Sequence, residues 1–143
     1  MRIRNQANFF ECANMAELIY KELSFKIMGV LFKVQNKLGT KYQEKYYQRA
    51  IESELKRQNI SFEREKLVRL SYEGESIGRY FIDFIIEGKI ALETKALDFF
   101  RKSDFKQVLG YLEALNLKLA IIVNFQTPRL SYKRILNSRV KLK

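Results

Sequence analysis

The chain has 143 residues, of which 47% are hydrophobic and 30% charged, so it suits one soluble domain with a single sizeable core. It has no histidine and one cysteine, Cys12, which excludes histidine-based catalysis, histidine- or cysteine-based zinc sites and internal disulfides. The formal net charge of +11 favours a polyanionic partner. Any catalysis therefore depends on Asp, Glu, Lys, Tyr or Ser side chains, or on a hard metal ion bound through oxygen.

No stretch approaches the roughly 20 apolar residues that a membrane span requires. Arg2 and Arg4 are not followed by the apolar run of a secretory signal. A single cysteine is typical of a reducing compartment. We therefore expect a cytoplasmic protein with no membrane partner.

Positive charge is concentrated toward the end of the chain. No acidic residue follows Glu113, whereas seven basic residues do: Lys118, Arg129, Lys133, Arg134, Arg139, Lys141 and Lys143. Such a segment suits the phosphate backbone of a nucleic acid. The alternative is a basic surface that only keeps the protein soluble.

Two helices are predicted before the first strand. After a loose leader of residues 1–15, apolar residues recur at helical spacing over residues 16–38, which predicts a well-buried helix that stops at Gly39. A second helix is expected over residues 42–58. Its inward stripe, spaced by four each time, is Tyr47, Ile51 and Leu55.

The inward side of the second helix begins with a carboxylate. Glu44 lies three residues before Tyr47 and therefore extends the buried stripe by one turn. In that position it can contribute an oxygen to a site on the sheet. Alternatively, it only complements the helix dipole.

The rest of the chain is rich in strand patterns. They predict strands over residues 67–72, 77–86, 90–96 and 117–125, and a helix over residues 104–116. The continuous apolar run of the last strand is typical of the middle of a mixed sheet, and the tail is expected to add one short strand or helix. The order α-α-β-β-β-α-β predicts one α/β domain over residues 16–143, built on three meandering strands and a crossover helix.

The most informative run is ALETKA at residues 91–96. It places Glu93 and Lys95 on one face of an otherwise apolar strand, because side chains alternate along a strand. Buried charges are costly unless they are paired or bind a metal. A three-residue loop at residues 87–89 sets Asp83 opposite Glu93, whereas a two-residue loop puts the two acids on opposite faces.

Two carboxylates about 5 Å apart repel each other as bare anions but can share a divalent cation. Glu44 can add a third oxygen, and Mg²⁺ or Mn²⁺ needs few protein ligands because it keeps several waters. Lys95 would orient a water for attack on phosphorus or offset charge in the transition state. The alternative is a structural ion pair of Lys95 with Asp83 or Glu93.

Asp83 and the run Glu93-Thr94-Lys95 after a hairpin resemble the D…ExK signature of the PD-(D/E)xK nuclease superfamily, and the order of elements resembles its α-β-β-β-α-β core. More narrowly, residues 17–135 resemble the small GxxExxY proteins of that superfamily. This resemblance is carried by GTKYQEKYY at residues 39–47, SFERE at 61–65, YFID at 80–83, ETKA at 93–96, and VNF to PRL at 123–130.

The resemblance implies a restriction-endonuclease-like fold, with a mixed sheet flanked by helices and an extra N-terminal helix. It aligns Glu44 with the family's helix glutamate and Tyr47 with its tyrosine. The chain departs from the family pattern at Lys41, where the family name has Gly.

The same resemblance implies roles for the site residues. Asp83 and Glu93 would bind the metal, with Glu44 and the Thr94 carbonyl as further oxygen ligands. Lys95 would be the catalytic lysine, and Glu44 an auxiliary acid.

Gln107 and Tyr111 resemble the QxxxY motif of RecB-type members of the superfamily. Residues four apart share one helix face. By resemblance, the two side chains would help to position the active site and the nucleic acid strand. The alternative is that Tyr111 is a core aromatic residue and Gln107 a surface residue.

Together these patterns predict a Mg²⁺- or Mn²⁺-dependent nuclease that hydrolyses phosphodiester bonds, with DNA preferred over RNA as the expected substrate. Arg129, Tyr132, Lys133 and Arg134 would contact the nucleic acid. The protein would be a monomer or a homodimer. The alternative is a non-catalytic nucleic-acid-binding or partner-binding module that retains the nuclease fold, because one fold can host unrelated functions.

Overall fold

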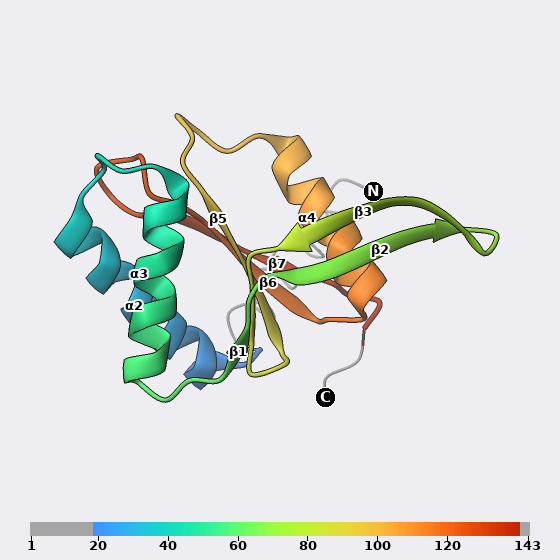
Figure 1. Ribbon diagram of the computed structural model, residues 1–143, viewed down its shortest axis with the longest axis horizontal. Helices are drawn as coiled ribbons and strands as arrows, with labels where there is room; N and C mark the ends of the chain where they lie inside the picture. Colours follow the sequence, from blue (N-terminus) through green and yellow to red (C-terminus); the bar gives the residue numbers. More distant parts are fainter. Residues whose placement is uncertain (1–18, 141–143) are drawn as a thin grey trace, which may run out of the picture.

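The computed structural model describes residues 19–140 and shows a mixed sheet with helices on both faces (Figure 1). The three helices of this part are α2 (Lys21–Leu38), α3 (Glu44–Arg57) and α4 (Lys102–Leu115). The strands are β1 (Phe62–Glu63), β2 (Lys66–Tyr72), β3 (Glu75–Ile82), β4 (Phe84–Ile86), β5 (Ile90–Lys95), β6 (Leu119–Asn124) and β7 (Ser131–Leu136). The main sheet has the order β1-β4-β5-β6-β7, and β2 and β3 form a separate hairpin.

Each face of the main sheet has its own hydrophobic core. α2 and α3 pack on one face, against apolar side chains of β4, β5 and β6. α4 packs on the other face, together with apolar residues of the hairpin β2–β3, which extends beyond the sheet (Figure 1). This mixed sheet flanked by helices, with α2 as the additional N-terminal helix, confirms the predicted restriction-endonuclease-like fold.

The centre of the sheet is formed by β5 and β6, which run parallel to each other. All six residues of β6 are buried, and the strand pairs antiparallel with β7 on its other side. This confirms the expected central strand of a mixed sheet. It also shows that the basic tail contributes a strand, which lies at one edge of the sheet.

The first helix differs from its prediction. It begins at Lys21, after Tyr20 adopts a left-handed backbone conformation, and the leader of residues 1–15 lies outside the described residues. It ends at Gly39, as predicted. Burial is confined to one side, since Phe25 is 80% exposed and Phe32 is 43% exposed. The apolar character of this helix therefore reflects a core face plus a second, exposed apolar face.

The inward stripe of α3 is confirmed, because Tyr47, Ile51 and Leu55 are all fully buried. The Tyr47 ring stacks on Phe125 with a centroid distance of 4.4 Å. Its hydroxyl donates a 2.6 Å hydrogen bond to the Gly39 carbonyl, which fixes the loop between α2 and α3. Tyr47 is therefore a structural residue that holds the start of α3 in place.

The strand predicted over residues 77–86 breaks at Asp83. Residues before the break form β3 and pair with β2, while residues after it form β4 and pair with β5. The break places Ile82 and Ile85 in the same core beside α4, which strict alternation along one strand would not allow. The expected three-strand meander is therefore wrong in one respect, because its first hairpin leaves the main sheet.

Two smaller findings complete the description of the fold. The short strand β1, which the sequence did not predict, pairs with β4. Within residues 19–140, no helix has the length and apolar character of a transmembrane segment. That residues 16–143 form one domain stays a prediction.

Candidate active site

The turn between β4 and β5 has the register that the acid pair requires. Ile86 pairs with Ile90 and Phe84 with Leu92, which sets Asp83 level with Glu93. The turn itself spans residues 87–89. Its first two residues, Glu87 and Gly88, have positive φ angles, which glycine adopts without strain. The three-residue loop predicted from the sequence is thus confirmed.

Asp83 and Glu93 are held together by hydrogen bonds between side chain and backbone. The Asp83 N–H donates to Glu93 Oε1 at 2.9 Å. In return, Asp83 Oδ2 accepts hydrogen bonds from the backbone N–H and the hydroxyl of Thr94, both at 2.8 Å. Each acid therefore satisfies a backbone donor on the opposite strand, and these bonds replace regular pairing at the break.

The acid pair is electrostatically unfavourable in the absence of a cation. Burial, followed by repulsion from Asp83, raises the pKa of Glu93 to about 7. Burial also raises the pKa of Asp83, although the two Thr94 hydrogen bonds and Lys95 partly oppose the rise. Glu93 is only 1% exposed, so solvent screens this repulsion little. A bound cation would relieve it.

Lys95 lies on β5 two residues after Glu93 and is partly exposed. Its positive charge partly offsets the rise in the pKa values of Asp83, Glu93 and Glu44, so Lys95 lies within electrostatic reach of all three carboxyls. Among the described residues, Lys95 takes part in no ion pair shorter than 4.0 Å. The lysine therefore faces the acids without a direct ion pair that would fix it.

Glu44 borders the acid pair from the first turn of α3. Its Oε1 accepts a 3.2 Å hydrogen bond from Gln48, whose Nε2 also donates to Thr94 Oγ1 at 2.9 Å. Burial and the nearby Asp83 raise the pKa of Glu44. Thr94 thus connects Asp83 to the helix, so that α3 and the strand break are positioned together.

A compact three-ligand metal cluster is not present in the part of the chain from residue 19 to residue 140. Glu93 is buried and Asp83 is partly buried, and the pKa values of both carboxyls are raised, so the two nevertheless fit a hard divalent ion. The two Thr94 donors occupy Asp83 Oδ2, which leaves Oδ1 for another ligand. That Glu44 and the Thr94 carbonyl complete the metal shell stays a prediction.

Two stacked tyrosines support Glu93 from the α4 side. The Tyr80 hydroxyl donates a 2.8 Å hydrogen bond to Glu93 Oε2. Its ring stacks on Tyr111 with centroids 4.1 Å apart. Burial, then the negative charge of Glu93, raises the pKa of Tyr80, so the phenol stays a donor. Tyr111 therefore reaches the site through Tyr80, while Gln107 lies exposed one turn earlier on α4.

Sequence reasoning missed Tyr80 for a specific reason. Alternation along an unbroken strand assigns Tyr80 to the face opposite Asp83. The break at Asp83 changes that relation and brings the hydroxyl to Glu93. The Thr94 hydroxyl and Gln48 were also missed, since neither residue type carries a pattern signal at these positions.

The loop that follows Lys95 is fixed by Asn124, which is fully buried at the end of β6. Its Oδ1 accepts hydrogen bonds from the N–H groups of Leu97 and Gln126, and its Nδ2 donates to the Leu97 carbonyl at 2.7 Å. A pocket of about 200 Å³ opens beside this loop. Its lining residues include Ala96, Asp98, Phe99, Arg101 and Gln126.

The predicted nucleic-acid contacts of the tail lie away from the acid pair. Tyr132 is level with Thr94, because both pair with Val123 of β6, so the two are about 10 Å apart across two strand spacings. Tyr132 and Arg134 line a groove against α2, whereas Arg129 and Lys133 are exposed. The structure therefore separates these residues from Asp83 and Glu93 by β6.

The mixed α/β sheet with helices on both faces has the arrangement of a restriction-endonuclease-like fold. The family model of the PD-(D/E)XK nuclease superfamily matches residues 21–135, and the chain belongs to this superfamily, whose members are generally nucleases.

The crystal structure of SSO0001 has a similar fold, with a TM-score of 0.51 and 22% sequence identity. The alignment covers 64% of this chain and 48% of that chain, so the present chain matches about half of the length of SSO0001. A comparison with curated proteins finds no match.

Proposed function

We propose that this protein is a divalent-metal-dependent nuclease that cleaves DNA and is related to the GxxExxY group within the superfamily. The observation that carries the proposal is the hydrogen-bonded pair of the partly buried Asp83 and the buried Glu93. Lys95 lies beside this pair and forms no direct ion pair among residues 19–140. Its monomeric or dimeric state and its cytoplasmic location stay predictions.

In this proposal Asp83 and Glu93 hold Mg²⁺ or Mn²⁺, and Glu44 contributes through a coordinated water or directly. The bound ion would lower the pKa of a water molecule and offset charge on the phosphate. Tyr80 keeps Glu93 oriented by donating to Oε2. Lys95 orients the attacking water or stabilises negative charge on the oxygens around phosphorus.

The raised pKa of Glu93 determines how metal binding depends on pH. Because the pKa of Glu93 is about 7, a fraction of the carboxyl groups carries a proton at neutral pH. Ion binding requires the ionised form and therefore releases that proton. Nuclease activity is accordingly expected to rise with pH through the region around 7.

One observation favours the alternative of a non-catalytic module that binds nucleic acid or a protein partner. Both Glu93 oxygens already accept hydrogen bonds, and the side chain is 1% exposed, which also suits a structural carboxylate. In this case Asp83 and Glu93 hold the strand break together, and no cleavage occurs.

Cleavage assays separate the two functions. Single-stranded, double-stranded and branched DNA and RNA are incubated with the protein and Mg²⁺, Mn²⁺ or EDTA. The nuclease proposal expects metal-dependent cleavage that Lys95→Ala and Asp83→Asn abolish while salt-sensitive binding is retained. The matched control Lys56→Ala removes an exposed lysine at the other end of α3 from Glu44 and should cleave normally. Absence of cleavage on every substrate would refute the proposal.

A further inference from the structure

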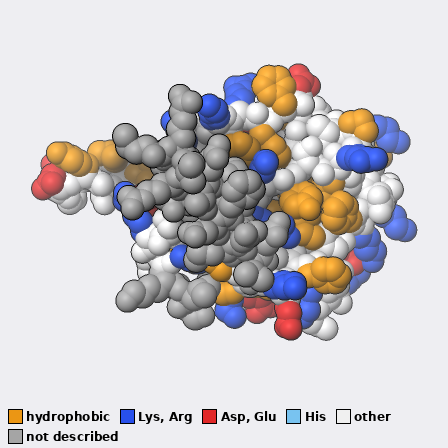
Figure 2. Space-filling view, turned by 180° about the vertical axis from the view of Figure 1, so that it is seen from behind, with side chains coloured by type: hydrophobic (Ala, Val, Ile, Leu, Met, Phe, Trp, Pro, Cys, Tyr) orange, Lys and Arg blue, Asp and Glu red, His pale blue; other side chains and the backbone are white. Residues whose placement is uncertain are grey.

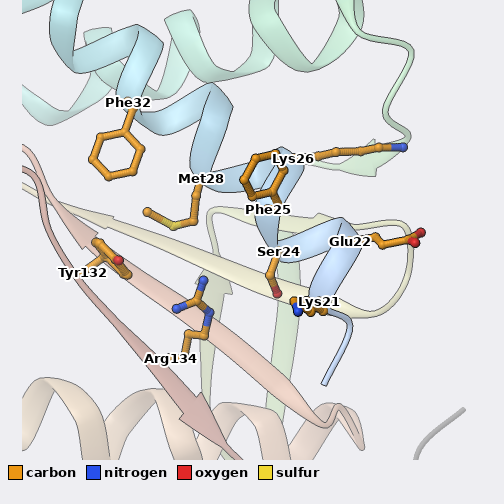
Figure 3. Close-up of a pocket in the computed structure, with 9 residues that line it drawn as sticks. All are labelled: Lys21, Glu22, Ser24, Phe25, Lys26, Met28, Phe32, Tyr132 and Arg134. Carbon is orange, nitrogen blue, oxygen red and sulfur yellow. The ribbon is translucent and has the colours of Figure 1, made fainter. Parts of the chain in front are cut away.

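A groove of about 820 Å³ lies between α2 and the edge strand β7, separate from the acid pair (Figure 3). The helix contributes Lys21, Ser24, Phe25 and Phe32, which recur at helical spacing along one side. The strand contributes Tyr132 and Arg134, which point toward the helix. The groove thus has one helical wall and one strand wall.

Three of the lining residues are exposed aromatic side chains. Phe25 is 80% exposed, Phe32 is 43% exposed and Tyr132 is 37% exposed. Phe32 and Tyr132 meet edge to face across the groove, with ring centroids 6.3 Å apart. Aromatic faces left in water in this way are typical of surfaces that bind a partner.

The groove is also basic. Lys21, Lys26 and Arg134 line it, against one acid, Glu22. The Arg134 guanidinium lies 5.6 Å from the centre of the Tyr132 ring. Figure 2 shows hydrophobic and basic side chains interspersed over the described surface on this side of the molecule.

Two buried polar atoms in the groove lack partners among the described residues. They are Ser24 Oγ, on a residue that is only 2% exposed, and Arg134 Nε. A buried polar atom without a hydrogen bond is unfavourable, and local strain or an unplaced water or ion can account for it. Both atoms are closed to solvent, but Arg134 is partly exposed as a residue, and the other N–H groups of its guanidinium can donate to a phosphate oxygen.

We propose that this groove binds a single-stranded segment of nucleic acid, with unpaired bases on the aromatic side chains and phosphates at Arg134 and Lys21. The inference rests on the proposed nuclease function, whose substrate strand it would hold. Aromatic faces beside cations are the usual means of binding single strands, because every unpaired base offers a face for stacking. A duplex has its bases already stacked and paired, so it gains less from these side chains.

The charges argue against a second copy of the chain as the occupant. Two copies that met through this groove would bring their Lys21, Lys26 and Arg134 side chains together, with only Glu22 from each copy to offset them. A polyanion instead gains favourable interactions with all of these cations.

The groove and the acid pair lie on either side of β6. Tyr132 at its strand wall is level with Thr94 of the acid site, about 10 Å away across two strand spacings. Because the buried strand β6 lies between them, the groove is a binding surface separate from Asp83 and Glu93, and a substrate strand would have to extend beyond it to reach the acids.

The test measures binding of a fluorescent single-stranded oligonucleotide to the full chain in EDTA, so that cleavage does not interfere. Phe25→Ala and Phe32→Ala should each weaken binding roughly 5- to 100-fold. Arg134→Gln should reduce the slope of log K against log salt by about 0.7. Binding of a fully paired hairpin should change little in the two Phe variants.

Tyr72→Ala is the matched control, because Tyr72 is 68% exposed on the β2–β3 hairpin and lies outside the groove. This variant should bind as the wild type does. Melting temperatures check that each variant is folded. Phe25→Ala carries the test if Phe32→Ala unfolds, since an 80% exposed ring contributes little to the core.

The outcomes separate this proposal from the nuclease function. Weaker single-strand binding by Phe25→Ala supports the groove even if no substrate is cleaved. Metal-dependent cleavage together with unchanged binding by the Phe25, Phe32 and Arg134 variants would overturn the groove and leave the nuclease function standing. A different result would favour a second copy of the chain as the occupant of the groove. In that case the wild type is a dimer, Phe25→Ala dissociates it, and oligonucleotide binding by the variant is unchanged, which would overturn the proposal.

Discussion

Replacing Glu93 by glutamine should make the metal-free protein more stable at neutral and alkaline pH. Glutamine has the same shape, so its carbonyl oxygen can still accept from the Asp83 N–H, and its amide can donate to the Tyr80 hydroxyl. The substitution removes the buried charge and its repulsion with Asp83. The acid pair is therefore expected to reduce stability in the absence of metal, as active sites often do.

The magnitude follows from the pKa of Glu93, which rises from 4.5 to about 7 on folding. The folded protein consequently binds more protons than the unfolded chain between these pH values, so its stability falls as pH rises through this window. At about 1.36 kcal/mol per pKa unit, the fall is at most about 3 kcal/mol. For a chain of this length that corresponds to about 10 °C in melting temperature.

The assay is denaturation followed by circular dichroism in EDTA at pH 5, 6, 7 and 8, for wild type and Glu93→Gln. The stability of the variant relative to the wild type should increase from pH 5 to about pH 7 and then level off. Millimolar Mg²⁺ should then stabilise the wild type at pH 8 more than the variant, because a ligand that binds the folded state shifts the equilibrium. Glu75→Gln, in the exposed hairpin, is the control and should show no pH-dependent difference.

A difference between Glu93→Gln and wild type that is the same at pH 5 and pH 8 would refute this reasoning. So would a variant that is less stable than wild type at pH 8. Either result would mean that hydrogen bonds to the ionised Glu93 outweigh its burial and its repulsion with Asp83.

Three further predictions concern the residues around the site. Tyr80→Phe removes the donor to Glu93 Oε2, so the pKa of Glu93 should rise further, and the pH profile of cleavage should move to higher pH; an unchanged profile would contradict this role. Asn124→Ala leaves backbone groups of the loop after β5 without partners, and urea denaturation should show a loss of about 2–4 kcal/mol. Tyr47→Phe removes the hydrogen bond to the Gly39 carbonyl and should cost about 1 kcal/mol in the same measurement, with cleavage retained; loss of cleavage in a folded Tyr47→Phe protein would give this tyrosine a role beyond structure.

The helices and the central strands were predictable because their signals are local and periodic. The stripe Tyr47, Ile51 and Leu55 lies on one face of α3, and that face is fully buried. The apolar run of β6 indicated burial on both faces. The register of the acid pair was also predictable, since the length of the loop at residues 87–89 decides which side chains of β4 and β5 face each other.

The break at Asp83 was not predictable, because it depends on contacts between residues far apart in the sequence. The pattern of residues 77–86 suits one continuous strand. Glu93 and Thr94 interrupt it by bonding the backbone and side chain of Asp83. Tyr80 could not be assigned to the site for the same reason, since its position depends on that interruption.

The exposed face of α2 shows a different limit. An apolar residue in a helix has the same sequence signal whether it lies in the core or lines a surface groove. Ile27 and Phe25 are both apolar, yet the first is fully buried and the second is 80% exposed. Only the position of β7 beside the helix distinguishes them, and that position depends on how the sheet is ordered.

The acids and the lysine of the site differ in what they reveal about function. Asp83 and Glu93 each accept a hydrogen bond from a backbone donor of the opposite strand, so each has a structural role whether or not the protein cleaves nucleic acid. Lys95 is partly exposed and forms no ion pair within 4.0 Å in the described part of the chain, so folding does not explain a cation beside two acids. If the protein is a nuclease, Lys95→Ala should remove cleavage with little change in melting temperature, whereas Asp83→Asn should change both. Lys95 is therefore the residue whose substitution separates catalysis from folding most cleanly.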